Sequence, residues 1–264
     1  MTRSPSSRRW LRAGALCTAV PAALLVFGQP LWAQRGPAPA ETGLAADVLN
    51  LACAPFAVRG MPATPLRITG GQDSFTRRNY QPGDLITINA GSVNGIKVGD
   101  EYFVRRPQVP RDQHPKPDDL VDIRTAGWIR VYAVDDTMSL ATISQACDTI
   151  EVGDYLEPFT APQPPAAKPT TAKPERDNYA HIMRGTDLRW SFGKGDYFLI
   201  DRGSIHGITT GAQFVIYRNK HEGGNFLFEL GEAVAVEVGP QVATLQVTLA
   251  RDAFSEGDLV AIRK

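Results

Sequence analysis

Short runs of apolar and alternating residues, separated by glycine, proline and aspartate, fill most of the chain. The segments 84–90, 101–106, 196–202 and 213–218 are rich in β-branched and aromatic residues, which is typical of strands. The segment 127–134 is followed by Asp-Asp-Thr and then by a second apolar stretch, which predicts a hairpin. The segments 231–238 and 242–249, separated by Gly-Pro-Gln, predict the same hairpin again.

Further segments extend this β pattern to both ends of each half. A Gly-Asp turn precedes a short apolar strand in 153–159 and again in 257–264. The segments 64–71 and 179–192 each add one strand, and a helix is expected only in 41–52. Five or six short strands in each half predict an all-β fold with two tandem small β-barrel or β-sandwich domains. Double-psi and other barrels with Gly-Asp turns are alternative folds.

The two halves are copies of each other. Residues 83–106 align with residues 195–218 without a gap, with nine identities in 24 positions. After an eight-residue shortening of the next loop, six more identities pair Gly127, Val134, Ala146, Asp148, Gly153 and Asp154 with Gly231, Val238, Ala250, Asp252, Gly257 and Asp258. This self-similarity indicates an internal duplication.

The most regular motif in both copies is a set of three glycines. They are Gly91, Gly95 and Gly99 in the first copy and Gly203, Gly207 and Gly211 in the second. A phosphate-binding loop needs a lysine followed by serine or threonine, whereas Lys97 of the first copy becomes Thr209 in the second. A helix-pairing glycine motif needs an apolar span of about 20 residues. We therefore predict that these glycines form turns between strands, where a positive φ is required.

Composition and proline content divide the chain into segments. With 264 residues, 43% hydrophobic and 21% charged, it suits a globular protein of one or two domains. The stretch 160–177 is a Pro/Ala-rich linker without apolar periodicity, expected to be extended rather than packed. We predict a flexible leader at 34–44, β domain 1 at 45–159 and β domain 2 at 178–264.

The N-terminus has the pattern of a secretory signal peptide, which we place at residues 1–33. A basic start is followed by about 15 apolar residues and by Leu-Trp-Ala, with cleavage expected after Ala33. The alternative is a membrane anchor, but this apolar stretch is shorter than the about 20 residues needed to span a bilayer. The expected location is periplasmic or secreted, with no membrane span after cleavage.

Charge and cysteine content agree with export. Removal of residues 1–33 leaves 24 basic and 28 acidic residues, without a basic patch, which argues against a nucleic-acid partner. Outside the signal peptide only Cys53 and Cys147 remain, and in an oxidising compartment they are expected to form one disulfide. The alternative is a pair of buried free thiols. We expect the bridge to attach the segment around Cys53 to domain 1 alone.

We find no pattern in the sequence that predicts catalysis, a metal site or a cofactor. The four histidines are scattered, and Asp118, Asp119 and Asp122 lack the spacing of a calcium loop. Ser92 and Ser204 lie between glycines, but not in the motif of a nucleophile elbow, and are expected to be turn residues.

The aromatic residues Trp128, Tyr132, Trp190 and Phe192 are candidates for a strip that stacks on sugars or on a partner protein. The alternative is that they fill the barrel cores. The loop 107–123, where the copies differ most, is expected to be a solvated insertion and a candidate recognition surface.

The glycine turn, Val-Gly-Asp, hairpin and closing Gly-Asp of each repeat resemble the C-terminal domain of flagellar assembly protein T. Over more of the chain, the pattern is similar to a group of uncharacterised exported bacterial β-repeat proteins. The resemblance to the flagellar domain covers each repeat, about 75 residues, and implies an envelope accessory module without catalysis. The chain departs from that family because it lacks the larger preceding domains and carries the module twice.

Three functions follow as hypotheses. The first is a non-catalytic exported envelope protein that acts as a protein-interaction or assembly accessory module, with an envelope protein as its partner. The second is a module that binds peptidoglycan or another polysaccharide of the cell wall. The third is a serine-type hydrolase that uses Ser92. The sequence favours the first.

Overall fold

The computed structural model describes residues 44–63, 65–72, 77–109, 114–166, 170–175, 177–185, 190–219 and 226–264. The expected signal peptide and residues 34–43 of the expected leader lie outside these described residues. Residues 44–264 form one compact unit that contains both copies of the repeat. We refer to residues 56–159 as body 1 and to residues 170–264 as body 2.

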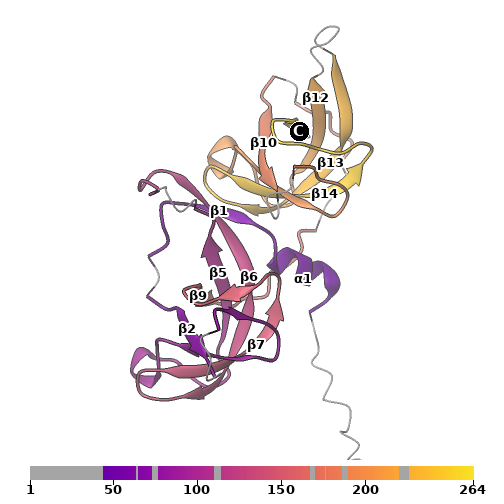
Figure 1. Ribbon diagram of the computed structural model, residues 1–264. Helices are drawn as coiled ribbons and strands as arrows, with labels where there is room; N and C mark the ends of the chain where they lie inside the picture. The colour runs from indigo at the N-terminus through magenta and orange to yellow at the C-terminus, as the bar shows by residue number, and fades with distance from the viewer. Residues whose placement is uncertain are drawn as a thin grey trace, which may run out of the picture. The chain divides into compact units, whose positions relative to one another are not determined.

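Body 2 is a closed antiparallel barrel of six strands, the orange-to-yellow part of Figure 1. The strands follow the order β10-β11-β14-β13-β12-β15, and β10 pairs with β15 to close the ring. Their bounds are β10 (Ala180–Gly185), β11 (Tyr197–Ile200), β12 (Gln213–Asn219), β13 (Leu227–Val238), β14 (Ala243–Ala250) and β15 (Leu259–Ile262). Phe198, Phe214 and Phe254 are fully buried inside this barrel, so its interior is a packed core.

Body 1 repeats this topology as a curled sheet. Its strands follow the order β2-β4-β7-β6-β5-β9, with bounds β2 (Ile68–Gly71), β4 (Leu85–Ile88), β5 (Glu101–Pro107), β6 (Leu120–Val134), β7 (Ser139–Ala146) and β9 (Tyr155–Pro158). The two outer strands approach each other, because Leu156 N–H donates to Leu66 O at 3.0 Å and Ile68 N–H donates to Asp154 O at 3.0 Å. Two short strands, β3 (Asn79–Tyr80) and β8 (Ile150–Glu151), pair separately.

Strand register confirms the all-β fold class and supports the duplication. In body 1, Gly127 lies opposite Ala146, and in body 2 the equivalent Gly231 lies opposite Ala250. A bulge occurs at the same place in both, between Val104 and Arg105 and after Ile216. The identities found in the second part of the sequence alignment therefore occupy equivalent places in the two sheets.

Apolar alternation explains which residues enter each core. Along β6, the side chains of Ile129 and Val131 are 0% and 1% exposed, whereas that of Tyr132, the residue after Val131, is 66% exposed. Successive strand side chains point to opposite faces, so the even spacing of Ile129 and Val131 places both inside. The same arrangement holds for β13, where Ala233 and Ala235 are buried in the barrel core.

Six equivalent turns, three in each body, use a glycine with positive φ. In each turn the residue after the glycine donates its N–H to the carbonyl three residues earlier, as in Asp100 to Lys97 at 3.1 Å. The glycine φ angles lie between +85° and +97°, which is the third position of a type II turn, at Gly83, Gly99, Gly153, Gly195, Gly211 and Gly257. Five of these turns place an aspartate next, and its carboxylate also accepts the N–H of the first turn residue, as in Asp100 with Lys97 at 2.9 Å.

Two segments differ from the sequence-based expectation. The end of the loop 107–123 is not a solvated insertion, because residues 120–123 begin β6 and pair with a further strand, β1 (Phe56–Arg59). Residues 170–175 of the linker pack against β15 and the residue after it, since Glu175 N–H donates to Ile262 O at 2.8 Å and the Arg263 side chain donates to Ala172 O. Both corrections have the same cause: backbone groups of a proline-bearing segment still find partners along a strand edge.

Candidate functional site

The six glycines singled out in the sequence lie in turns, but the expected positive φ is found at four of them and is wrong for Gly91 and Gly203, whose φ angles are −138° and −139°. Gly99 and Gly211 belong to the type II turns, while Gly95 and Gly207 end short 3-10 helices, Ser92–Asn94 and Ser204–His206, with φ of +84° and +80°. Gly91 and Gly203 begin these helices, where a Cβ atom would lie 2.2 Å from Asp135 O and 2.3 Å from Gly239 O. These two positions need glycine because the backbone of the next hairpin passes directly over them.

The candidate serines belong to the same turns. Ser92 donates its N–H to Asp135 O at 2.9 Å, and its hydroxyl lies 3.5 Å from Asp136 Oδ1. In body 2, His206 Nδ1 accepts the N–H of Gly203 at 3.1 Å, which replaces the contact that Asn94 Oδ1 makes with Gly91 in body 1. The contacts of Ser92 and His206 are thus contacts that build turns.

The candidate aromatic residues are separated by the fold. Trp128 is 7% exposed and stacks on Phe159 with ring centroids 5.2 Å apart. Phe192 is buried in the core of body 2, while Tyr132 and Trp190 are 66% and 87% exposed in different bodies. These four residues therefore form no single strip, and Trp190 is the most exposed of the large apolar residues described.

A disulfide joins Cys53 to Cys147, with a Cα–Cα distance of 5.6 Å. Cys53 ends the helix α1 (Ala46–Ala52), and Cys147 follows β7. The expectation that this segment is attached to domain 1 alone needs correction. The covalent bond does lie within domain 1, but the residues next to Cys53 also pack on body 2.

An apolar cluster and a hydrogen bond carry this packing between the end of α1, with the residues that follow it, and body 2. Leu51 and Ala54 share a buried apolar cluster with Tyr197, Val234 and Val236. The hydroxyl of Thr244, on β14, donates to Pro55 O at 2.8 Å. The Pro55 carbonyl is therefore satisfied by a residue 189 positions away in the chain.

An ion pair also joins the two bodies. Arg184 on β10 donates Nη1 to Asp122 Oδ2 on β6 at 2.7 Å, and the Asp122 side chain is 18% exposed. Burial raises the pKa of Asp122, and the Arg184 guanidinium opposes that rise. The pair is thus partly desolvated, and its charge compensation depends on both bodies.

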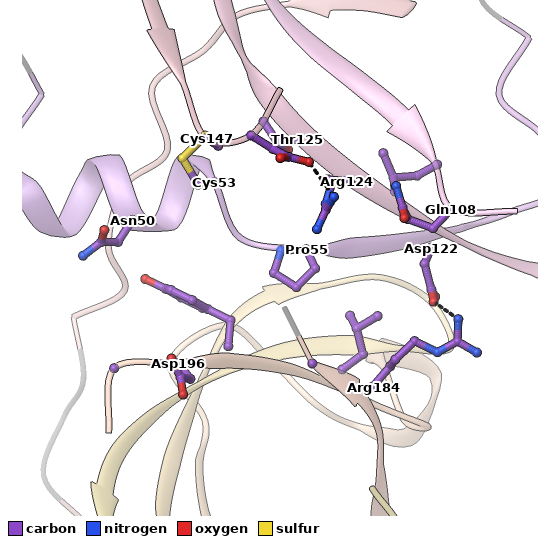
Figure 2. Close-up of a pocket in the computed structure, with 16 residues that line it drawn as sticks. Asn50, Cys53, Pro55, Gln108, Asp122, Arg124, Thr125, Cys147, Arg184 and Asp196 are labelled. Carbon is purple, nitrogen blue, oxygen red and sulfur yellow. Dashed lines mark hydrogen bonds and ion pairs between the residues drawn. A yellow bond between two sulfur atoms is a disulfide. The ribbon is translucent and has the colours of Figure 1, made fainter. Parts of the chain in front are cut away.

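A cavity of about 280 Å³ lies between these contacts (Figure 2). Residues from α1, β6, β10 and β11 line it, together with the disulfide. Figure 2 shows the Cys53–Cys147 bridge at one end and the Asp122–Arg184 pair at the other. Arg124 points into the space between them, paired with Asp148.

A larger cavity of about 650 Å³ adjoins the first. The two share Gln108, Asp122 and Arg184 in their linings. We call the two cavities together the junction groove. Its second part is lined by His114, Pro115, Asp119 and Leu120, which come from the loop that the sequence marks as a candidate recognition surface.

The acidic residues of that loop have other partners than a metal ion. Asp118 pairs with Arg59 at 3.2 Å, Asp119 accepts the N–H of Lys116 at 2.7 Å, and Asp122 pairs with Arg184. Within the described ranges, no group of three or more histidine, cysteine or acidic residues is arranged to hold a metal ion. In the same part of the chain, no helix is long and apolar enough to cross a membrane.

Comparison with known proteins adds no family to these observations. No family model matches the chain, and no curated protein matches its sequence.

Most residues of the junction groove carry no signal in the sequence. Asn50, Gln108, Arg124 and Arg184 belong to segments far apart in the chain, and no spacing links them. Two signals are present in the sequence: the predicted Cys53–Cys147 pair, which lines the smaller cavity, and the divergence of the loop 107–123 between the copies, which lines the larger one. The other side of the groove is formed by residues of α1, β10 and β11, which come together only through the packing of body 2 against α1.

Proposed function

We propose that this protein is an exported, non-catalytic envelope module that binds protein partners during assembly. Export is supported by the pattern of residues 1–33, and the location that follows is periplasmic or secreted. The observation that carries the proposal is a pair of equivalent apolar side chains, Val93 and Ile205, which are 70% and 67% exposed. They occupy the same position of the 3-10 helix in the two bodies.

Both side chains sit on a fixed backbone. Val93 N–H donates to Asp136 O at 3.1 Å, and Ile205 N–H donates to Pro240 O at 3.1 Å. Met138, 49% exposed, belongs to the hairpin turn that Val93 contacts in body 1. A single exposed apolar residue is common on protein surfaces. An exposed apolar residue at the equivalent position of a rigid turn in both copies is suited to burial against a partner protein at low entropic cost.

Site-specific photocrosslinking tests this proposal. A photoreactive amino acid at position 93 or 205 should give discrete adducts with an envelope protein in cells. The same label at Lys97, which is exposed in the same loop, is the matched control. Val93→Asp and Ile205→Asp should reduce capture of that partner at least tenfold. Adducts that are no stronger than those from position 97 would refute it.

A second candidate function is binding of cell-wall glycan, and Trp190 is the observation that favours it. Its ring is 87% exposed, and exposed indole rings stack on the apolar faces of sugars. Sedimentation of the protein with purified cell walls, compared with Trp190→Ala, tests this candidate. We also propose, on the turn pattern alone, that each repeat is related to the flagellar assembly protein T domain.

A further inference from the structure

The junction groove combines three features of a ligand site. It is concave, it lies where two bodies meet, and its lining mixes apolar surfaces with a few polar groups. Pro55 supplies apolar surface in the smaller cavity, and Val109, Leu120 and Met183 supply it in the larger one. Gln108 lines both cavities, so a ligand in either cavity can contact its side chain.

The charges of the groove disfavour an anionic ligand. Each of its arginines is already paired with a carboxylate, Arg124 with Asp148 and Arg184 with Asp122. The remaining acidic residues of the lining are Asp119, Asp196 and Glu256. A phosphate or carboxylate ligand would face this acidic excess and would have to displace an existing partner of an arginine.

Hydroxyl groups suit such a lining better than charged or purely apolar ligands. A hydroxyl can donate to a carboxylate oxygen and accept from a guanidinium N–H at the same time, so it bridges an ion pair without changing its charge. The amides of Asn50 and Gln108 offer the same combination of donor and acceptor. The apolar surfaces can contact the C–H faces of sugar rings.

We propose that the junction groove binds a neutral glycan strand, running from the smaller cavity past the Asp122–Arg184 pair into the larger one. This inference rests on the second candidate function, glycan binding, and names its site and its ligand class. The two adjoining cavities, of about 280 and 650 Å³, favour several sugar units over a single one.

The test is calorimetric titration of the full chain with a tetramer of N-acetylglucosamine, and with a galacturonic acid tetramer as the anionic counterpart. The neutral tetramer should bind at least tenfold more tightly than the anionic one. Asn50→Trp, which fills the smaller cavity from an exposed helix position, and Gln108→Ala should each weaken binding at least tenfold. Gln81→Ala, an exposed glutamine outside the groove, should bind like the wild type.

Each result decides between the site and the function. If the neutral tetramer shows no heat of binding at millimolar concentration, or if both groove variants bind it like the wild type, the inference is wrong. If the protein still sediments with cell walls in that case, glycan binding stands and only its location is refuted. If sedimentation also fails, both fall. Unchanged circular dichroism spectra show that Asn50→Trp and Gln108→Ala are folded.

Discussion

Replacing Cys53 and Cys147 by serine should destabilise body 1 much more than body 2. The bridge connects residues 94 positions apart, so its removal frees a long loop in the unfolded chain. The chain-entropy relation gives about 4 to 5 kcal/mol for a loop of this length, and removal of a native disulfide commonly costs about 2 to 5 kcal/mol. Cys147 lies in body 1, and both cysteines pack against the buried Phe103 and Trp128 of body 1, so we expect most of that loss there.

Trp128 provides the assay for body 1. Its ring belongs to the buried cluster that includes Ala52 and packs against both cysteines. With the other three tryptophans changed to phenylalanine, urea unfolding monitored by fluorescence reports this cluster alone. For a loss of about 4 kcal/mol and an m-value of about 2 kcal/mol/M, the midpoint should fall by about 2 M.

Amide hydrogen exchange of β11 and β14 reports body 2 in the same samples. The free energy of exchange in these strands should fall by less than a third of the unfolding free energy that body 1 loses. The reason is that the barrel of body 2 is closed by its own strands. An unchanged Trp128 midpoint, or equal losses in both bodies, would refute the reasoning. Reduction of the wild-type protein with a phosphine should reproduce the effect of the double substitution.

Three further substitutions, one of them with a matched glycine control, test the turns and the buried polar groups. Gly91→Ala places a Cβ 2.2 Å from a backbone carbonyl and should cost at least about 3 kcal/mol by urea unfolding, while Gly193→Ala, with open space around it, should stay within about 1 kcal/mol. Tyr155→Phe removes a buried hydroxyl with no hydrogen-bond partner and should stabilise the protein by about 1 kcal/mol. Burial raises the pKa of Tyr155, so the wild type should lose stability as the pH rises above about 10, by up to about 1.4 kcal/mol per pH unit, and the variant should lose less. Asp258→Ala breaks the double hydrogen bond to Arg218 and should cost about 3 kcal/mol, whereas an effect below 1 kcal/mol would show that the pair is dispensable.

The sequence was sufficient for features that depend on local chemistry. A glycine followed by aspartate defines a type II turn within four residues, so the turns at Gly99 and Gly153 could be located without knowing the fold. The duplication supports these turn assignments independently, because the glycine that a turn needs is the same in both copies while the residues around it differ. The Cys53–Cys147 pairing followed from the small number of cysteines.

Features that depend on contacts between distant segments could not be predicted. The strand β1 pairs with the start of β6 through residues about 64 positions apart, and its four residues show no clear alternation. The Asp122–Arg184 pair joins residues 62 positions apart and in different copies. No local pattern encodes such a pairing, because it depends on how α1 positions the two bodies.

The duplication also makes the two proposed binding features distinguishable by stoichiometry. Val93 and Ile205 are equivalent positions, so a partner that recognises this turn has two sites on each chain. The junction groove is formed by unlike faces: Asp122 lies on β6, whereas Arg184 lies on β10, whose equivalent in body 1 is β2. The groove is formed by different faces of the two bodies, so each chain has one such groove. A glycan that binds there must therefore saturate at one molecule per chain. A titration that saturates at two would place the glycan on the repeated surfaces and not at the junction.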